Sequence, residues 1–115
     1  MNITNRAPFQ KAPKAKPDPT YLAAVRQLPC CICDGWGMVQ LSPTTAHHPI
    51  MGRYSARKVP DRQAIPLCDG HHQGTFDTSK IAVHREPQAW AEAYGVDGDF
   101  TAVTQDNVDR MGGAA

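Results

Sequence analysis

The sequence predicts a small α+β domain that is stabilised by zinc and flanked by short helices and disordered tails. Three observations lead to this fold class. Two short segments that each offer two metal ligands stand at Cys30–Cys33 and Cys68–His71. Between them, residues 44–48 and 63–67 are β-favouring and bounded by turn residues, which is typical of short strands. The 115-residue length favours one domain, and both ends are poor in large apolar residues.

The zinc prediction rests on ligand spacing. Two residues separate Cys30 from Cys33, and Cys68 and His71 repeat that spacing. Such pairs form tight turns that offer two ligands each, so the four side chains predict one structural Cys3His zinc site. Each pair is accompanied by an Asp-Gly dipeptide, which tolerates the backbone conformations of a tight turn. A folded part of about 75–85 residues needs such a site, because its apolar core alone gives little stability.

Three alternatives to this ligand set stay open in the sequence. The four cysteines could form two disulfides, although Cys30, Cys31 and Cys33 are too crowded to suit two separate bridges. Cys31 could serve as a ligand, but its single-residue gap to Cys33 makes joint binding strained. His72 could replace His71, although the two-residue spacing favours His71.

The chain divides into three predicted parts. Residues 1–17 predict a disordered basic arm, because they combine lysines and prolines with almost nothing to bury. Residues 18–97 hold the zinc-binding domain, and residues 98–115 are expected to form a flexible acidic tail. The absence of an apolar signal segment or a long apolar run predicts a cytoplasmic protein that does not enter a membrane.

Local signals place the helices. Asp18 and Pro19 predict a helix start, and apolar residues at helical spacing continue to Pro29. We expect this helix to pack beneath the first zinc-binding turn. Residues 34–41 predict a turn followed by a short strand or an irregular loop. Pro87 and Gly95 bound a second helix.

The histidines left over by the zinc site point to a second metal. If His71 binds the structural zinc, then its neighbour His72 projects in another direction. His47, His48 and His72 then remain unassigned. A site rich in thiolates is closed, whereas a site built from histidines can hold a metal ion with open coordination positions, as hydrolysis requires.

These residues resemble the HNH nucleases, which have a ββα-metal active site. The resemblance is carried by the His47-His48 pair, by Pro-Leu-Cys at 66–68 and by Cys-x-x-His-His at 68–72. It is closer to the phage recombination-enhancement (Ref) nucleases, which act on DNA together with the RecA recombinase. It extends from about Tyr21 to Gly95, including Ala-Val-His at 82–84.

The resemblance implies an HNH-type ββα-metal domain over 18–97. The activity it implies is that of a metal-dependent DNA endonuclease or nickase in phage or bacterial recombination, with RecA filaments as a partner. It makes His47 a metal ligand and His48 the general base. His84 matches a histidine of the Ref nucleases and is a candidate either for a further ligand beside His72 or for a phosphate contact. Gln63 stands where the motif would have Asn, a departure that puts the activity in question.

Charge and ligand type extend these expectations. Mg²⁺ or Mn²⁺ is expected as the most useful catalytic ion, and Zn²⁺ or Ni²⁺ is the alternative because imidazole ligands suit the later transition metals. Residues 1–62 carry nine Lys/Arg against three Asp/Glu, whereas residues 63–115 carry three against eight, so DNA is expected to meet the first half. The expected DNA contacts are Arg53, Tyr54, Arg57, Lys58 and Arg62 in a loop and Lys11, Lys14 and Lys16 in the basic arm. The competing hypothesis is a non-catalytic zinc-knuckle module that binds nucleic acid or an acidic partner.

Overall fold

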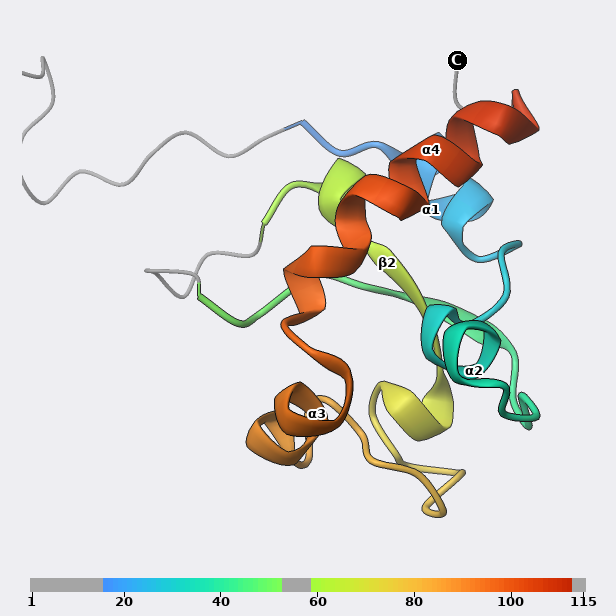
Figure 1. Cartoon of the computed structure of the whole chain (residues 1–115). Helices are drawn as coiled ribbons and strands as arrows, with labels where there is room; N and C mark the ends of the chain where they lie inside the picture. Colours follow the sequence, from blue (N-terminus) through green and yellow to red (C-terminus); the bar gives the residue numbers. More distant parts are fainter. Residues whose placement is uncertain (1–15, 53–58, 113–115) are drawn as a thin grey trace, which may run out of the picture.

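The computed structural model describes residues 16–52 and 59–112. These residues form a small mixed α and β structure with one two-stranded sheet, as the sequence predicted (Figure 1). The elements are α1 (Pro19–Val25), α2 (Cys31–Trp36), β1 (Thr44–His47), η1 (Asp61–Gln63), β2 (Ile65–Cys68), η2 (Asp69–His71), α3 (Pro87–Tyr94), η3 (Asp97–Phe100) and α4 (Thr101–Met111), where η denotes a 3-10 helix. Most of the basic arm, with Lys11 and Lys14, lies outside the described residues, as do Arg53, Tyr54, Arg57 and Lys58.

The sheet is an antiparallel pair that holds both histidine and cysteine ligands. β1 pairs with β2 in a register that sets Thr44 opposite Cys68 and His47 opposite Ile65. Every residue of β2 is buried, so this strand forms the centre of the domain. Cys68 and His47 therefore lie at opposite ends of the ladder. The chain then turns through η2, and no long helix follows β2 before α3 among the described residues.

The predicted first zinc-binding turn is helical as far as Trp36, so the prediction for residues 34–41 is wrong at 34–36, whereas residues 37–41 form a turn and an irregular loop as expected. Cys31–Trp36 form α2, and the Cys30 sulfur at its N-cap accepts a hydrogen bond from the Cys33 N–H. Gly37 ends the helix with φ +68°, a left-handed conformation that glycine adopts without steric cost. The four residues Cys30–Cys33 thus present both sulfurs from one short turn.

The helix that starts at Pro19 forms as predicted but packs elsewhere. The Asp18 carboxylate accepts a hydrogen bond from the Tyr21 N–H at 3.1 Å, as an N-cap does. Its buried side chains, Tyr21 and Val25, join Val108 of α4 in a cluster of their own. The expected packing beneath the zinc-binding turn is therefore wrong, and α1 lies beside α4 (Figure 1).

The flexible tail predicted for residues 98–115 is wrong for most of that range. Thr101–Met111 form α4, which buries Thr104 and Val108 one helical turn apart. The Thr101 hydroxyl donates to the Gln63 carbonyl at 2.9 Å, and the Gln105 amide donates to the Arg62 carbonyl at 2.7 Å. Helix α4 is therefore fixed to both α1 and η1, and it belongs to the folded domain.

The predicted zinc ligands are surrounded by the main apolar core. Cys30, Cys33 and Cys68 pack with a buried set made of Ile32, Ile65, Leu67, Val83 and Trp90. Trp90 comes from α3, whose predicted bounds at Pro87 and Gly95 are confirmed. Among the helices of residues 16–52 and 59–112, none has the length and apolar character that a membrane crossing demands.

Candidate metal centres

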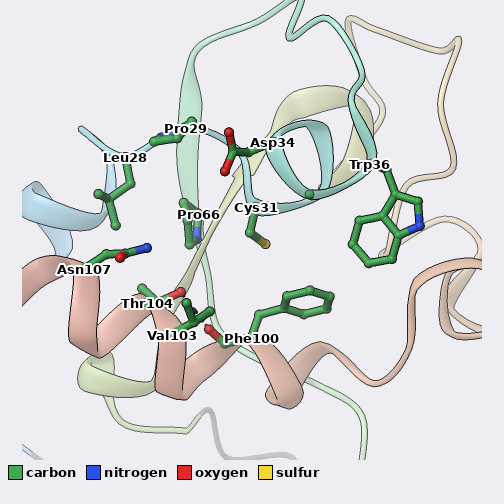
Figure 2. A pocket seen from close by; sticks show the side chains of 11 residues that line it. Leu28, Pro29, Cys31, Asp34, Trp36, Pro66, Phe100, Val103, Thr104 and Asn107 are labelled. Carbon is green, nitrogen blue, oxygen red and sulfur yellow. Dashed lines mark hydrogen bonds between the residues drawn. The ribbon is translucent and has the colours of Figure 1, made fainter.

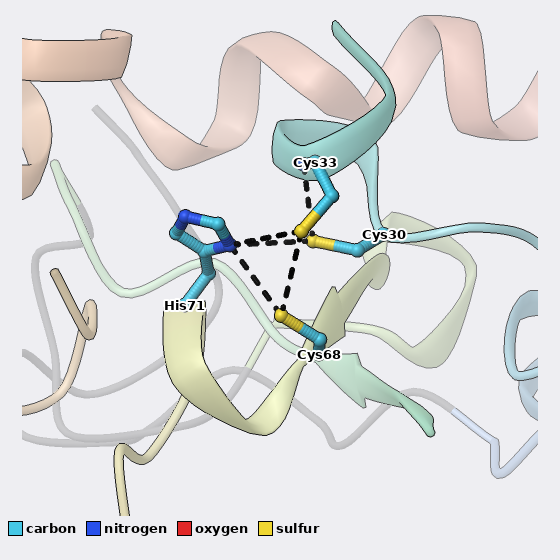
Figure 3. Close-up of side chains that lie close together, drawn as sticks. All are labelled: Cys30, Cys33, Cys68 and His71. Carbon is cyan, nitrogen blue, oxygen red and sulfur yellow. Dashed lines mark hydrogen bonds between the residues drawn. The ribbon is translucent and has the colours of Figure 1, made fainter. Parts of the chain in front are cut away.

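Cys30, Cys33, Cys68 and His71 form a compact buried cluster that could hold a metal ion (Figure 3). The Nδ1 atom of His71 lies 3.6 Å from the Cys30 sulfur, 3.6 Å from the Cys33 sulfur and 3.4 Å from the Cys68 sulfur. The sulfurs of Cys33 and Cys68 lie 3.8 Å apart. The predicted Cys3His combination is thus brought together from α2, β2 and η2.

These separations match the edges of a zinc coordination tetrahedron. With Zn–S bonds of about 2.3 Å and Zn–N bonds of about 2.05 Å, tetrahedral geometry requires sulfurs about 3.8 Å apart and sulfur–nitrogen pairs about 3.6 Å apart. The sulfur pair Cys33–Cys68 measures 3.8 Å and the sulfur–nitrogen pairs measure 3.4–3.6 Å. The donor set, three soft thiolates and one imidazole, also fits a closed structural zinc site.

The hydrogen bonds of the cluster make one of its three thiols acidic. A hydrogen bond from Cys30 lowers the pKa of Cys68 to about 3, and this effect, with help from His71, outweighs burial. The pKa of Cys30 is raised, first because it donates to Cys68 and then because it is buried. Burial and the negative charge of Cys68 also raise the pKa of Cys33. A divalent ion would displace the remaining thiol protons, so metal binding should release protons.

The partners of His71 fix which of its nitrogens faces the cluster. Its Nε2 atom lies 3.4 Å from the Tyr94 hydroxyl, and its backbone carbonyl accepts a hydrogen bond from the Trp90 indole at 3.1 Å. Both aromatic residues belong to α3. Helix α3 therefore holds the imidazole so that Nδ1 points at the three sulfurs.

This geometry decides between the alternative ligand sets that the sequence left open. All four cysteines are free, so neither disulfide forms. Cys31 is not a member of the cluster. It faces a groove of about 240 Å³ between α2 and α4, beside Trp36, Phe100 and Val103 (Figure 2). Burial raises the pKa of Cys31 to about 12, which leaves its thiol protonated.

A second group of candidate ligands consists of His47, His72 and His84. One nitrogen from each ring lies within 4.8 Å of the others, so this group could also hold a metal ion. The ring centroids are 5.0 Å apart for His47 and His72 and 5.1 Å apart for the two pairs that include His84. The backbone N–H of His84 donates to the carbonyl of His72 at 3.1 Å, which ties these two residues together.

The hydrogen bonds of this second group assign its free nitrogens. His47 Nε2 lies 2.9 Å from the Asp97 carboxylate, and both side chains are fully buried. Because a carboxylate can only accept, Nε2 carries the proton, and His47 Nδ1 is left as a buried atom without a partner. An unpaired lone pair in the interior is costly unless it binds something.

The hydrogen bonds of His72 likewise show which of its ring nitrogens carries the proton. The Thr45 hydroxyl donates to the Leu67 carbonyl at 2.8 Å, and its oxygen lies 2.7 Å from His72 Nδ1. Since the hydroxyl has only one proton, its oxygen must accept from His72 Nδ1, which leaves Nε2 free. Burial, and then the neighbouring His47 and His84, lower the pKa of His72 to about 4. His72 is therefore neutral at pH 7 and able to bind a cation.

Asp97 links this histidine group to the chain that follows β1. Its carboxylate also accepts hydrogen bonds from the backbone N–H groups of Ile50 at 2.7 Å and Met51 at 3.2 Å. Burial works to raise the pKa of Asp97, but the hydrogen bonds from His47 and these two N–H groups together outweigh it and lower the pKa. An ionised Asp97 is therefore stable in the interior next to His47.

His48 lies outside both groups. Its Nε2 atom lies 2.8 Å from the carboxylate of Asp61, and both side chains are about 85 % buried, with 14 % and 15 % of their surface exposed. It is close enough to His72 to contribute to the lowered pKa of that residue. The two adjacent histidines are thus separated. His47, at the end of β1, belongs to the histidine group, and His48 lies beside that group.

Two of the residues expected to contact DNA, Arg62 and Lys16, lie in the described part of the chain. The Arg62 guanidinium pairs with the Asp18 carboxylate at 3.3 Å and stacks over the Tyr21 ring at 4.7 Å, so it stabilises the start of α1. About half of its side chain remains exposed. Lys16 and Gln63 are exposed.

Three residues that contact the histidines were not identified from the sequence: Asp61, Asp97 and Thr45. The first two lie 13 and 50 residues from the histidines they contact, and no spacing rule connects a carboxylate to a histidine over such separations. Thr45 stands two residues before His47, but only the fold brings it to His72.

Comparison with known proteins places the chain in a family. No curated protein and no solved structure matches the chain. A family model described as a protein of unknown function (DUF968) matches residues 3–112, nearly the whole sequence. The chain therefore belongs to the DUF968 family.

Proposed function

We propose that this protein is a metal-dependent DNA endonuclease or nickase of the HNH class, which acts with RecA filaments in phage or bacterial recombination. The observation that carries the proposal is the presence of two ligand groups of different chemistry in one small domain. One is a closed set of three thiols and an imidazole, and the other is a set of three imidazoles.

The two groups suit two different tasks. Three thiolates and an imidazole fill all four positions of a tetrahedral zinc ion, so that site would stabilise the fold and do no chemistry. Three histidines leave coordination positions for water and substrate. His84 is exposed, so the histidine group is open to solvent on one side, as a site that receives a polymer must be.

The topology is compatible with an HNH-type unit. A two-stranded antiparallel sheet is followed by a helical turn, and the histidines come from the first strand and from the end of that turn. The turn is the short 3-10 helix η2 rather than a long α-helix. His84 supplies the third ligand from the loop that follows.

In this proposal, His47 Nδ1 and His72 Nε2 hold the ion together with His84, and Asp97 and Thr45 keep the rings in the required tautomers. When bound, the divalent ion would neutralise a non-bridging phosphate oxygen and the departing 3′ oxygen. His48 accepts a proton from the attacking water, whose oxygen forms a bond to phosphorus. The P–O3′ bond breaks, its electron pair stays on O3′, and a solvent proton completes the 3′ hydroxyl.

DNA is the proposed substrate because of where the positive charge lies in the sequence. Of the nine Lys/Arg residues in the first half, four fall in the basic arm, four fall in residues 53–62, and the ninth is Arg26. Both ends of residues 49–61 are held close to the histidines, one by Asp97 and the other by the contact of Asp61 with His48. Lysine and arginine side chains in such a loop would contact the phosphate backbone without reading sequence.

The test compares the purified wild type with His48→Ala and with Gln73→Ala. Gln73 is exposed and adjacent to His72, so it is a matched control outside the proposed site. Supercoiled plasmid and circular single-stranded DNA are incubated with Mg²⁺, Mn²⁺, Zn²⁺ or Ni²⁺, with and without RecA filaments. We expect metal-dependent cleavage that falls by about 10²–10⁴-fold in His48→Ala and persists in Gln73→Ala.

Two results would contradict the proposal in different ways. Full cleavage by a folded His48→Ala protein would reject His48 as the base. DNA binding without cleavage under all of these conditions, with one tightly held zinc per chain, would instead identify a non-catalytic zinc-knuckle module.

A further inference from the structure

The contact between His48 and Asp61 is built into the fold. Asp61 is the first residue of η1, and its second carboxylate oxygen accepts a hydrogen bond from the Asp18 N–H at 2.8 Å. The carboxylate is thus held at both oxygens, by His48 on one and by the start of α1 on the other. Helix α4 also holds η1 in place, because two of its side chains donate hydrogen bonds to the Arg62 and Gln63 carbonyls.

Such a fixed acceptor determines the tautomer of His48. The Asp18 N–H donates to one oxygen of the Asp61 carboxylate, and His48 Nε2 faces the other oxygen, which can only accept. His48 must therefore carry its proton on Nε2, which leaves Nδ1 as the nitrogen able to accept a proton. The same arrangement holds at the neighbouring residue, where Asp97 fixes the proton of His47 on Nε2.

We propose that Asp61 is the positioning residue of the general base: it holds the His48 ring in place and keeps Nδ1 unprotonated for the attacking water. This inference rests on the proposed nuclease function. Asp61 acts through His48 and contacts neither substrate nor metal ion. A purely structural role for Asp61, as an anchor for the start of α1, is the competing explanation.

Asp61→Asn separates the two explanations. An asparagine side chain has one accepting oxygen and one donating NH2 group in place of two acceptors. If the oxygen keeps the bond to the Asp18 N–H, then the NH2 group faces His48 Nε2 and can bond only to an unprotonated nitrogen. The substitution would preserve the anchor while forcing the proton of His48 to Nδ1, the tautomer that cannot act as base.

The experiment measures both the tautomer and the reaction in the zinc-loaded full chain. Nitrogen-15 NMR of the histidine rings, at a pH where they are neutral, should show His48 protonated at Nε2 in the wild type and at Nδ1 in Asp61→Asn. In the cleavage assay, kcat should fall by about 10²–10⁴-fold with KM nearly unchanged. Asp106→Asn, an exposed carboxylate on α4, serves as the control and should change neither quantity.

A double-mutant cycle completes the test. In a His48→Ala background, Asp61→Asn should cost no further activity, because Asp61 acts only through His48. An Asp61→Asn protein that folds, keeps its metals and cleaves at the wild-type rate would overturn the inference while leaving the nuclease intact. Equal further losses in both backgrounds would also overturn it, in favour of the anchor. A wild type inactive under every condition would instead refute the proposed function, and this inference with it.

Discussion

His71 and His72 are consecutive in the chain, yet their side chains enter different ligand groups. His71 directs Nδ1 at the sulfurs of Cys30, Cys33 and Cys68, while His72 joins His47 and His84. Because His71 is the last residue of η2 and His72 caps it, the position of the His72 ring depends on how η2 is held at the thiol cluster. Metal binding at the first group would therefore help to position His72 in the second.

The first prediction concerns the four cysteines. Cys68→Ala removes a ligand from the buried cluster, and we expect it to lose zinc and to unfold. Structural zinc contributes on the order of 10–16 kcal/mol in small zinc-binding peptides, which exceeds the stability left to a domain of this size. Cys31→Ala is the matched control, because Cys31 lies outside the cluster. Zinc content by elemental analysis and far-UV circular dichroism measure the outcome, and equal zinc loss in both variants would contradict it.

The second prediction concerns the partner of His47. Asp97→Asn removes the charge that holds the His47 ring, so we expect the second metal ion to bind about 10–100-fold more weakly. The zinc of the cysteine cluster should be retained. Asp99→Asn, on the same 3-10 helix and exposed, is the control. Titration calorimetry with Mn²⁺ or Ni²⁺ on the zinc-loaded protein gives the affinity, and an unchanged affinity would argue against histidine coordination at this group.

The cysteine and histidine cluster that could bind zinc and two of the helices could be predicted because their signals are local. Two-residue spacing marks the Cys30–Cys33 and Cys68–His71 pairs, and capping residues mark α1 and α3. The histidine group could be predicted from the sequence only in part. His47 and His72 were identified as leftovers, and His84 entered through family resemblance. The supporting carboxylates could not be predicted, because their contacts depend on the tertiary arrangement of η1 and η3.

Helix α4 was missed for a different physical reason. Only Thr104 and Val108 of its eleven residues are buried, and one of these is polar. An acidic segment with so narrow an apolar stripe has the composition of a solvated tail. What makes it helical is packing against Tyr21 and Val25, which lie about 80 residues earlier in the sequence.

The third prediction is a pH dependence of stability. The folded-state pKa of His72 is lowered to about 4, mainly by burial, whereas an unfolded histidine titrates near 6.5. Between these values the unfolded chain binds a proton that the folded chain does not, so stability should fall as pH falls from about 6.5 to about 4. The shift corresponds to about 3 kcal/mol at most, and partial exposure of His72 reduces this to about 1–2 kcal/mol.

Urea unfolding of the zinc-loaded protein, without the second metal ion, measures this dependence. His72→Gln should flatten the stability profile in that window, because glutamine does not titrate. A profile with the same slope in the variant and in the wild type would show that other groups cause the loss.

The fourth prediction tests whether α4 belongs to the domain. Val108 is fully buried against Tyr21 and Val25, whereas Val103 on the same helix is 51 % exposed. Val108→Ala leaves a cavity in that small cluster and should lower the free energy of unfolding by about 1–3 kcal/mol. Val103→Ala makes the same chemical change at the surface and should stay within about 0.5 kcal/mol of the wild type. Chemical denaturation of both variants decides the matter, since a free acidic tail would make the two substitutions equally harmless, whereas a helix that closes the α1 cluster makes only the first one costly.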